Sequence, residues 1–151
     1  MKAVLLAGAF AAFASLSAGQ DIAMKTQGGI GWVCGGAGVE ERAALAALRP
    51  QANLELLFVT ARRGGYLADV EVAIFPGDKN SPVVQITAGG PICMISVPKG
   101  NYRIDATYAG VSRSLRVAAD TRPARAVFAF PEEPWDGIKA SDEEKQQATR
   151  P

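Results

Sequence analysis

Hydrophobic and polar residues alternate along most of the second half of the chain, which is the pattern of half-buried β-strands. The segment 102–108 alternates strictly, so Tyr102, Ile104, Ala106 and Tyr108 are predicted to face inward. Turn residues separate such segments about every 8 to 12 residues, which is typical of an all-β sandwich or barrel. The pattern predicts seven strands, at residues 53–60, 66–75, 83–87, 91–97, 102–108, 111–118 and 124–130.

One short helix is predicted ahead of these strands, at residues 39–49. The segment consists largely of strong helix formers, with two glutamates in its first turn and Arg49 in its last, which suits the helix dipole. Pro50 ends the helix. Leu45 and Leu48 lie three residues apart and would place a small apolar stripe on the strands. Strands do not alternate with long helices, so a parallel α/β fold is not expected.

The segment 28–38, just before this helix, is dense in glycine. A glycine-rich loop that leads into a helix can bind phosphate through its backbone amides. The Lys-Ser/Thr pair of a P-loop and a surrounding βαβ unit are both missing here. We therefore expect a flexible connector or an edge-strand bulge in this segment.

The first 19 residues have the features of a secretory signal peptide. Lys2 precedes an uncharged apolar run at residues 3–16, and the small residues Ser17, Ala18 and Gly19 follow it. A transmembrane helix needs roughly 20 apolar residues, so a cleaved signal fits this shorter run better than a membrane anchor or a buried helix. We expect export to the periplasm, with secretion as the alternative, and no membrane span after cleavage.

Composition and charge indicate one globular domain with an acidic tail. The chain is 48% hydrophobic and 21% charged, as an ordinary globular protein is, and its net charge of +1 gives no reason to expect a nucleic-acid partner. Residues 20–130 carry 12 basic and 9 acidic side chains, whereas residues 131–151 carry 3 and 6. The expected organisation is a signal peptide (1–19), a glycine-rich arm with the helix (20–52), a β-sandwich (53–130) and an acidic disordered tail (131–151).

The chain contains no histidine. This excludes Ser-His-Asp and Cys-His nucleophile systems and HExxH zinc sites. Asp69 and Glu71, two apart on one strand, suggest either paired carboxylates for acid–base chemistry or simply the solvated face of a half-buried strand. Asp78, Asn80 and Asp105 are not spaced as a calcium loop. We expect no catalytic residue, no metal and no cofactor, and hence not an enzyme.

The two cysteines, Cys34 and Cys93, are expected to form a disulfide, because the count is even and the exported compartment is oxidising. Cys93 has the same parity as Ile95 and Val97 and should face inward. The bridge would close a loop of about 60 residues and tie the arm to the core, which stabilises the fold by about 4 kcal/mol. Two buried free thiols are the alternative.

Two further groups of side chains are candidates for binding. The densest basic stretch consists of Arg113, Arg116, Arg122 and Arg125. It is either a site for an anionic glycan, a lipid head group or the acidic tail, or a solvated face. Trp32 and Trp135 flank the predicted sandwich and would either dock a partner or a sugar, or pack against the fold.

The end of one strand and the start of the next carry Val97, Pro98, Gly100 and Tyr102. This Val-Pro-x-Gly-x-Tyr pattern resembles the hallmark of carboxypeptidase regulatory-like domains. The segment 67–78 is similar to that family's G-x-P-L-x-G-V-x-V stretch, with Asp69 where the family has glycine. The resemblance covers about residues 53–118, and Pro-x-Gly-x-Tyr turns also occur in collagen-adhesin B-type and starch-binding-like sandwiches.

The resemblance implies an all-β, seven-stranded antiparallel transthyretin-like (prealbumin-like) β-sandwich that supports folding or binding and is not a catalyst. The wider layout looks like a group of small exported bacterial proteins of unassigned activity. The leading hypothesis is thus a non-enzymatic exported protein with a binding or structural role toward a protein or a cell-envelope component. The alternatives are a carbohydrate-binding or adhesin-type module and an envelope hydrolase that uses carboxylates. Ligand identity and oligomeric state stay open.

Overall fold

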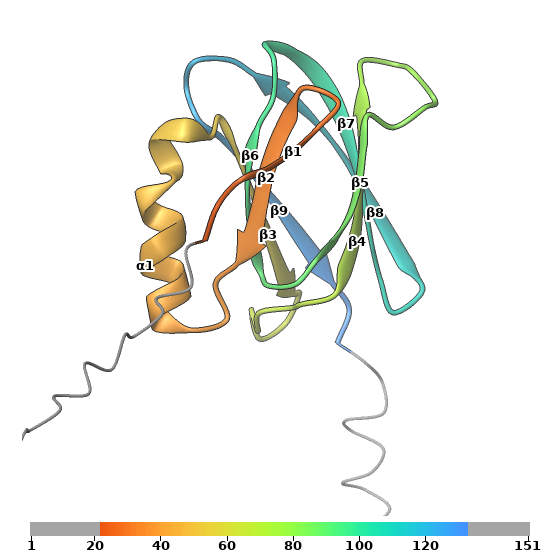
Figure 1. Ribbon diagram of the computed structural model, residues 1–151. Coiled ribbons are helices and arrows are strands. Elements are labelled where there is room, and N and C mark those ends of the chain that lie inside the picture. The colour runs from red at the N-terminus through yellow and green to blue at the C-terminus, as the bar shows by residue number, and fades with distance from the viewer. Residues whose placement is uncertain (1–21, 133–151) are drawn as a thin grey trace, which may run out of the picture.

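A computed structural model describes residues 22–132, which form two β-sheets and one α-helix (Figure 1). The predicted signal peptide and almost all of the predicted tail lie outside these residues. The strands are β1 (Lys25–Gln27), β2 (Ile30–Gly35), β3 (Leu54–Thr60), β4 (Val70–Pro76), β5 (Val84–Ala88), β6 (Ile92–Ser96), β7 (Gly100–Tyr108), β8 (Val111–Ala119) and β9 (Ala124–Phe130).

Five strands form sheet A, in the order β1-β2-β6-β3-β9, and four form sheet B, in the order β5-β4-β7-β8. The pairs are antiparallel except that β9 runs parallel to β3, from Leu54 opposite Ala124 to Thr60 opposite Phe130. The expectation of seven antiparallel strands is therefore wrong in its count and in this pair. A parallel pair needs a long connection, and here β6 and all of sheet B lie between β3 and β9 in the chain.

All seven strands that the alternation predicts are present, and β9 has the predicted bounds. The largest difference is in β4, which begins at Val70 instead of residue 66. Asp69 has a φ of +58°, a left-handed conformation that interrupts an extended strand. Its backbone N–H donates to the Ala88 carbonyl at 2.7 Å, while Tyr66 forms only an isolated bridge to Val59.

The glycine-rich segment is neither a flexible connector nor an edge bulge, because β2 lies between β1 and β6 in sheet A. Gly28 and Gly29 form the β1–β2 turn with φ values of +58° and +78°, which favour glycine. A Cβ on Gly90 would collide with the backbone of Gly35, so the chain can approach β2 closely there only as glycine. These glycines thus allow the tight turn and the close backbone packing of sheet A. Ile30 of β2 is buried in the main core.

The main core lies between the two sheets. Leu56 and Phe58 of β3 and Phe128 of β9 come from sheet A, and Val72 of β4 and Ile104 of β7 from sheet B, all at most 2% exposed. Alternate residues of strands in both sheets thus meet in one apolar layer, which makes the fold a β-sandwich.

Helix α1 (Val39–Ala47) packs on the outer face of sheet A, where it covers β2 and β6 (Figure 1). Leu45 of the helix forms a second apolar cluster with Val33 and Met94, and Leu48 packs against it, as the predicted stripe requires. Arg49 was expected in the last helical turn, but it begins a separate 3₁₀-helix, η1 (Arg49–Gln51), because Leu48 already caps α1. Within residues 22–132, no helix has the length and apolar character needed to cross a membrane.

Candidate functional site

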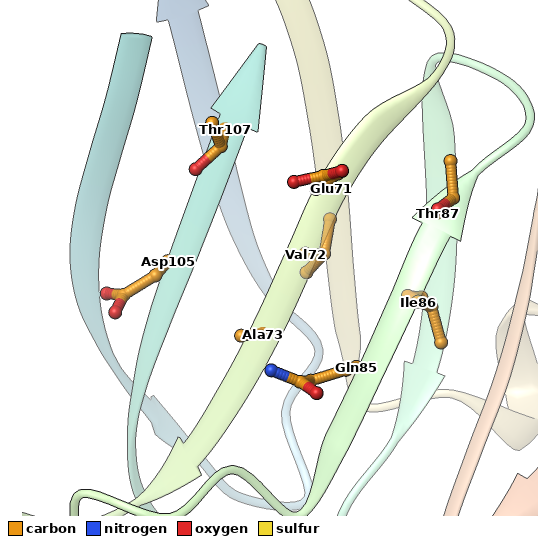
Figure 2. A pocket seen from close by; sticks show the side chains of 8 residues that line it. All are labelled: Glu71, Val72, Ala73, Gln85, Ile86, Thr87, Asp105 and Thr107. Atoms are coloured by element: carbon orange, nitrogen blue, oxygen red, sulfur yellow. The ribbon is translucent and has the colours of Figure 1, made fainter. Parts of the chain in front are cut away.

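The outer face of sheet B carries a row of polar side chains that neither described helix covers (Figure 1). Strand pairing aligns the outward-facing residues of β5, β4 and β7. Glu71 lies opposite Thr87 on one side and Thr107 on the other, and Ala73 lies between Gln85 and Asp105. Figure 2 shows these side chains around a depression of about 460 Å³. It forms where the small Ala73 side chain is flanked by longer ones.

Hydrogen bonds fix one side of this depression. The Ser114 hydroxyl of β8 donates to Asp105 Oδ1 at 2.6 Å, and Arg103 Nε lies 3.4 Å from the same oxygen. The hydroxyls of Thr107 and Ser112 are 2.8 Å apart. The polar groups of β7 and β8 are thereby held in place on rigid strands, as selective polar recognition requires.

Arg103 also covers an aromatic ring on this face. Phe75 lies four residues after Glu71 on β4 and therefore on the same outer side of the strand, yet it is only 8% exposed. The Arg103 guanidinium lies 4.1 Å from the centre of the Phe75 ring, in the position of a cation–π contact. Register places the two residues opposite each other. No sequence pattern marks Arg103 in advance, because only the pairing of β4 with β7 brings it to Phe75.

The two carboxylates considered for acid–base chemistry do not line one depression. Asp69 precedes β4 and does not line the depression, while Glu71 does. Both side chains belong to exposed residues. The carboxylate that shares the depression with Glu71 is Asp105, two residue pairs away on the neighbouring strand.

The Val-Pro-x-Gly-x-Tyr positions form a structural clip where the chain passes from sheet A to sheet B. Tyr102 is 7% exposed, and its hydroxyl donates to the Pro98 carbonyl at 2.7 Å. Burial raises the pKa of this phenol above its ordinary value. Gly100 has a φ of +154°. Asn53, which the sequence analysis did not single out, completes the clip: its Nδ2 donates to the Val97 carbonyl at 2.8 Å, and its Oδ1 accepts from the Val97 N–H at 2.9 Å.

The four arginines of the basic stretch do not share one face. Arg113 lies opposite the buried Ala106, whereas Arg116 lies opposite the outward Arg103, so the two point to opposite sides of β8. Arg113 Nε donates to the Ala129 carbonyl of β9 at 3.2 Å, which links the edges of the two sheets. Arg116 is paired with Asp78 at 2.7 Å.

The remaining two arginines lie on the other sheet or in a loop. Arg125 is on β9, where its Nε is 3.3 Å from Glu55 Oε1. Arg122 is exposed in the loop between β8 and β9. A single anion site made of all four arginines is therefore not assembled in the described part of the chain.

The cysteines and Trp32 belong to the scaffold. Cys34 and Cys93 form a disulfide between directly opposed residues of β2 and β6, with their Cα atoms 4.1 Å apart, as the sequence predicts. Cys93 is fully buried. Trp32 is half-buried against the main core, which agrees with packing, and Trp135 lies outside the described residues.

Among residues 22–132, no three histidine, cysteine, aspartate or glutamate side chains gather as a metal site would require. Comparison with known proteins gives no match for this chain among protein-family models, curated proteins or solved structures.

Proposed function

We propose that this chain is a non-enzymatic, exported protein with a transthyretin-like (carboxypeptidase regulatory-like) sandwich, which binds a protein or cell-envelope partner. The observation that supports this proposal is the polar outer face of sheet B. The face spans four strands, no described helix packs on it, and the polar side chains that line its depression are two hydroxyls, an amide and two carboxylates. Such groups recognise a partner by hydrogen bonds at positions that the sheet fixes in advance.

The charge of the face specifies the partner further. Glu71 and Asp105 both line the depression, and of the cations near them, Arg103 lies against Asp105 and over Phe75. The face therefore offers mainly hydrogen-bond acceptors beside the threonine hydroxyls. A partner that presents amide, hydroxyl or cationic groups complements it.

A charge placed in the centre of the face tests this proposal. Ala73→Arg introduces a long cationic side chain into the depression, and Thr26→Arg, on the exposed strand β1 of the other sheet, is the matched control. A photo-crosslinking residue at position 107 should capture an envelope partner in cells. We expect Ala73→Arg to abolish this product and Thr26→Arg to leave it intact. A product unchanged by Ala73→Arg would place the binding surface elsewhere.

Export is the second part of the proposal and is tested separately. Its support is the apolar run after Lys2 and the small residues that follow it. Amino-terminal sequencing of the protein from an envelope fraction should give Gln20, or a residue just before it, as the first residue. A mature protein that begins at Met1 would contradict cleavage.

The absence of catalysis is tested on the purified protein. The chain has no histidine, and Asp69 and Glu71 are exposed and separated. We expect no hydrolase, transferase or isomerase turnover. Robust turnover that a point substitution in the sandwich abolishes would overturn this part.

A carbohydrate is the alternative partner, and the polar lining of the depression favours it over an apolar ligand. The depression has a volume of about 460 Å³, which lies in the range of small-molecule sites. Glu71, Gln85 and Asp105 provide the planar polar groups that bind sugar hydroxyls. Calorimetric titration with a panel of glycans and peptidoglycan fragments decides this. Binding that Ala73→Arg removes would establish the alternative, and absence of binding across the panel would exclude it.

A further inference from the structure

A second depression, on the opposite side of the molecule, holds charged side chains that the proposed function does not use. It has a volume of about 330 Å³ and lies between η1 and the outer face of β3 and β9 in sheet A. Helix α1 covers β2 and β6 and stops short of this part of the sheet. We call this depression, lined by Arg49, Glu55, Arg125 and neighbouring apolar residues, the η1 groove.

Three charged side chains meet at the η1 groove. The Glu55 carboxylate lies between two guanidinium groups, with Oε2 3.5 Å from Arg49 Nη2 and Oε1 3.3 Å from Arg125 Nε. Glu55 is directly opposite Arg125 in the parallel β3–β9 pair, so register holds these two side by side. Two positive charges against one negative charge leave the groove with a net charge of +1.

The arginines are accessible to a ligand, while the carboxylate is largely enclosed. The side chains of Arg49 and Arg125 are 64% and 58% exposed, and that of Glu55 is 16% exposed. A guanidinium has five N–H donors, and the contact with Glu55 engages one nitrogen of each arginine. One additional anionic group at this point would balance the charges and accept hydrogen bonds from both arginines.

The remaining side chains of the η1 groove are apolar. Ala52, Pro123 and Ala124 have exposed surface there, whereas Leu54 and Met94 border the groove but are only 1% and 2% exposed. These side chains offer no hydrogen bond to the amides of a peptide. A ligand that fits has one anionic end and an otherwise apolar body.

We propose that the η1 groove binds an organic monocarboxylate with a short apolar body. The carboxylate would lie between Arg49 and Arg125, and the body against Ala52, Pro123 and Ala124. A water-sized group occupies about 30 Å³, so a groove of about 330 Å³ holds a body of about ten such groups. Octanoate has this size and charge and is the probe for the test.

The test is a titration of octanoate into isotopically labelled protein, followed by NMR, with the neutral 1-octanol as the control ligand. We expect saturable shifts confined to η1, β3 and β9, and binding of 1-octanol at least about tenfold weaker, because it cannot accept from both guanidiniums as an anion does. Arg49→Gln and Arg125→Gln should each weaken octanoate binding about fivefold or more. Glu55→Gln should tighten it, because the competing carboxylate is removed.

The arginine variants and the glutamate variant are expected to change octanoate affinity in opposite directions, and this distinguishes a ligand site from a structural ion pair. If the three charges served stability alone, Glu55→Gln would not improve octanoate binding. Arg116→Gln, which removes an exposed paired arginine from β8 in sheet B, is the matched control and should leave binding unchanged. Equal binding of octanoate and 1-octanol, or weaker binding to Glu55→Gln, would overturn the proposal. Ala73→Arg should bind octanoate normally, so a failure here is independent of the partner proposed for sheet B.

Discussion

Loss of the Cys34–Cys93 bridge should produce a large decrease in stability. The bridge joins residues 59 apart in the sequence and links β2 to β6. The perturbation is reduction of the purified protein, compared with the double variant Cys34→Ala/Cys93→Ala. Reduction removes the cross-link and keeps both sulfur atoms, whereas the double variant also removes packing around Cys93, which is fully buried.

The magnitude follows from the loop that the bridge closes. In the chain-entropy model, a loop of this length restricts the unfolded chain by about 4 kcal/mol at 25 °C. Reduction should therefore lower the free energy of unfolding by about 4 kcal/mol, and the melting temperature by an amount on the order of 10–20 °C. The double variant should lose about 1 kcal/mol more, for the lost packing of the buried side chain.

Urea unfolding followed by tryptophan fluorescence measures the three forms under the same conditions. Reduced and double-variant proteins should have midpoints well below that of the oxidised protein, with the double variant lowest. If the oxidised and reduced proteins differ by less than about 0.5 kcal/mol, the bridge does not restrict the unfolded chain as this reasoning requires. A mass shift of alkylated thiols in the protein isolated from cells would show that the bridge is not formed there.

Three further predictions concern the turns and the clip. Asn53→Ala removes two hydrogen bonds to the Val97 backbone and should cost about 2 kcal/mol in urea unfolding, whereas a loss below about 0.5 kcal/mol would contradict the clip. Ala109 and Gly110 form the two-residue turn between β7 and β8, with φ values of +47° and +77°. Such a turn favours Asn-Gly, so Ala109→Asn should raise the free energy of unfolding by about 0.5–1 kcal/mol. A destabilised variant would be evidence against this turn. The N–H of the next residue, and then Lys99, lower the pKa of Asp120. The stability that the ionised Asp120 contributes is thus present above its ordinary pKa and is lost as pH falls through its lowered pKa. NMR titration of Asp120 should show a midpoint below 3.8, and this midpoint should rise in Lys99→Met. An unchanged midpoint in the variant would refute the role of Lys99.

Alternation of apolar and polar residues predicts most of this fold, because most strands turn one face toward the main core. It fails at β1, whose three residues are all polar and exposed, and at β2, where Gly31 and Gly35 interrupt the alternation as loop residues would. The constraint on glycine near β2 is steric, because a Cβ on Gly90 would collide with the backbone of Gly35. Alternation also cannot show that β9 returns beside β3, since strand order depends on contacts far apart in the sequence.

The candidate surfaces were only partly predictable for the same reason. Parity alone places Glu71 on a solvated face, and this agrees with its exposure. That Asp105 joins it, and that Arg49 and Arg125 enclose Glu55, follows from pairing and from the position of η1. These contacts cannot be predicted from spacing along the chain, because each one combines residues from separate elements.

The two proposed binding surfaces use none of the most recognisable sequence features of the chain. The disulfide holds β6 to β2, and the clip around Val97 joins the start of β3, the end of β6 and the start of β7. Both act at the scaffold, where Cys93 and Tyr102 are buried. The two candidate binding surfaces lie on the outer faces of the sheets and contain none of the residues of the clip or the bridge. Substitutions at Ala73 and Glu55 therefore test the two proposed surfaces directly, whereas substitutions in the motif test the scaffold.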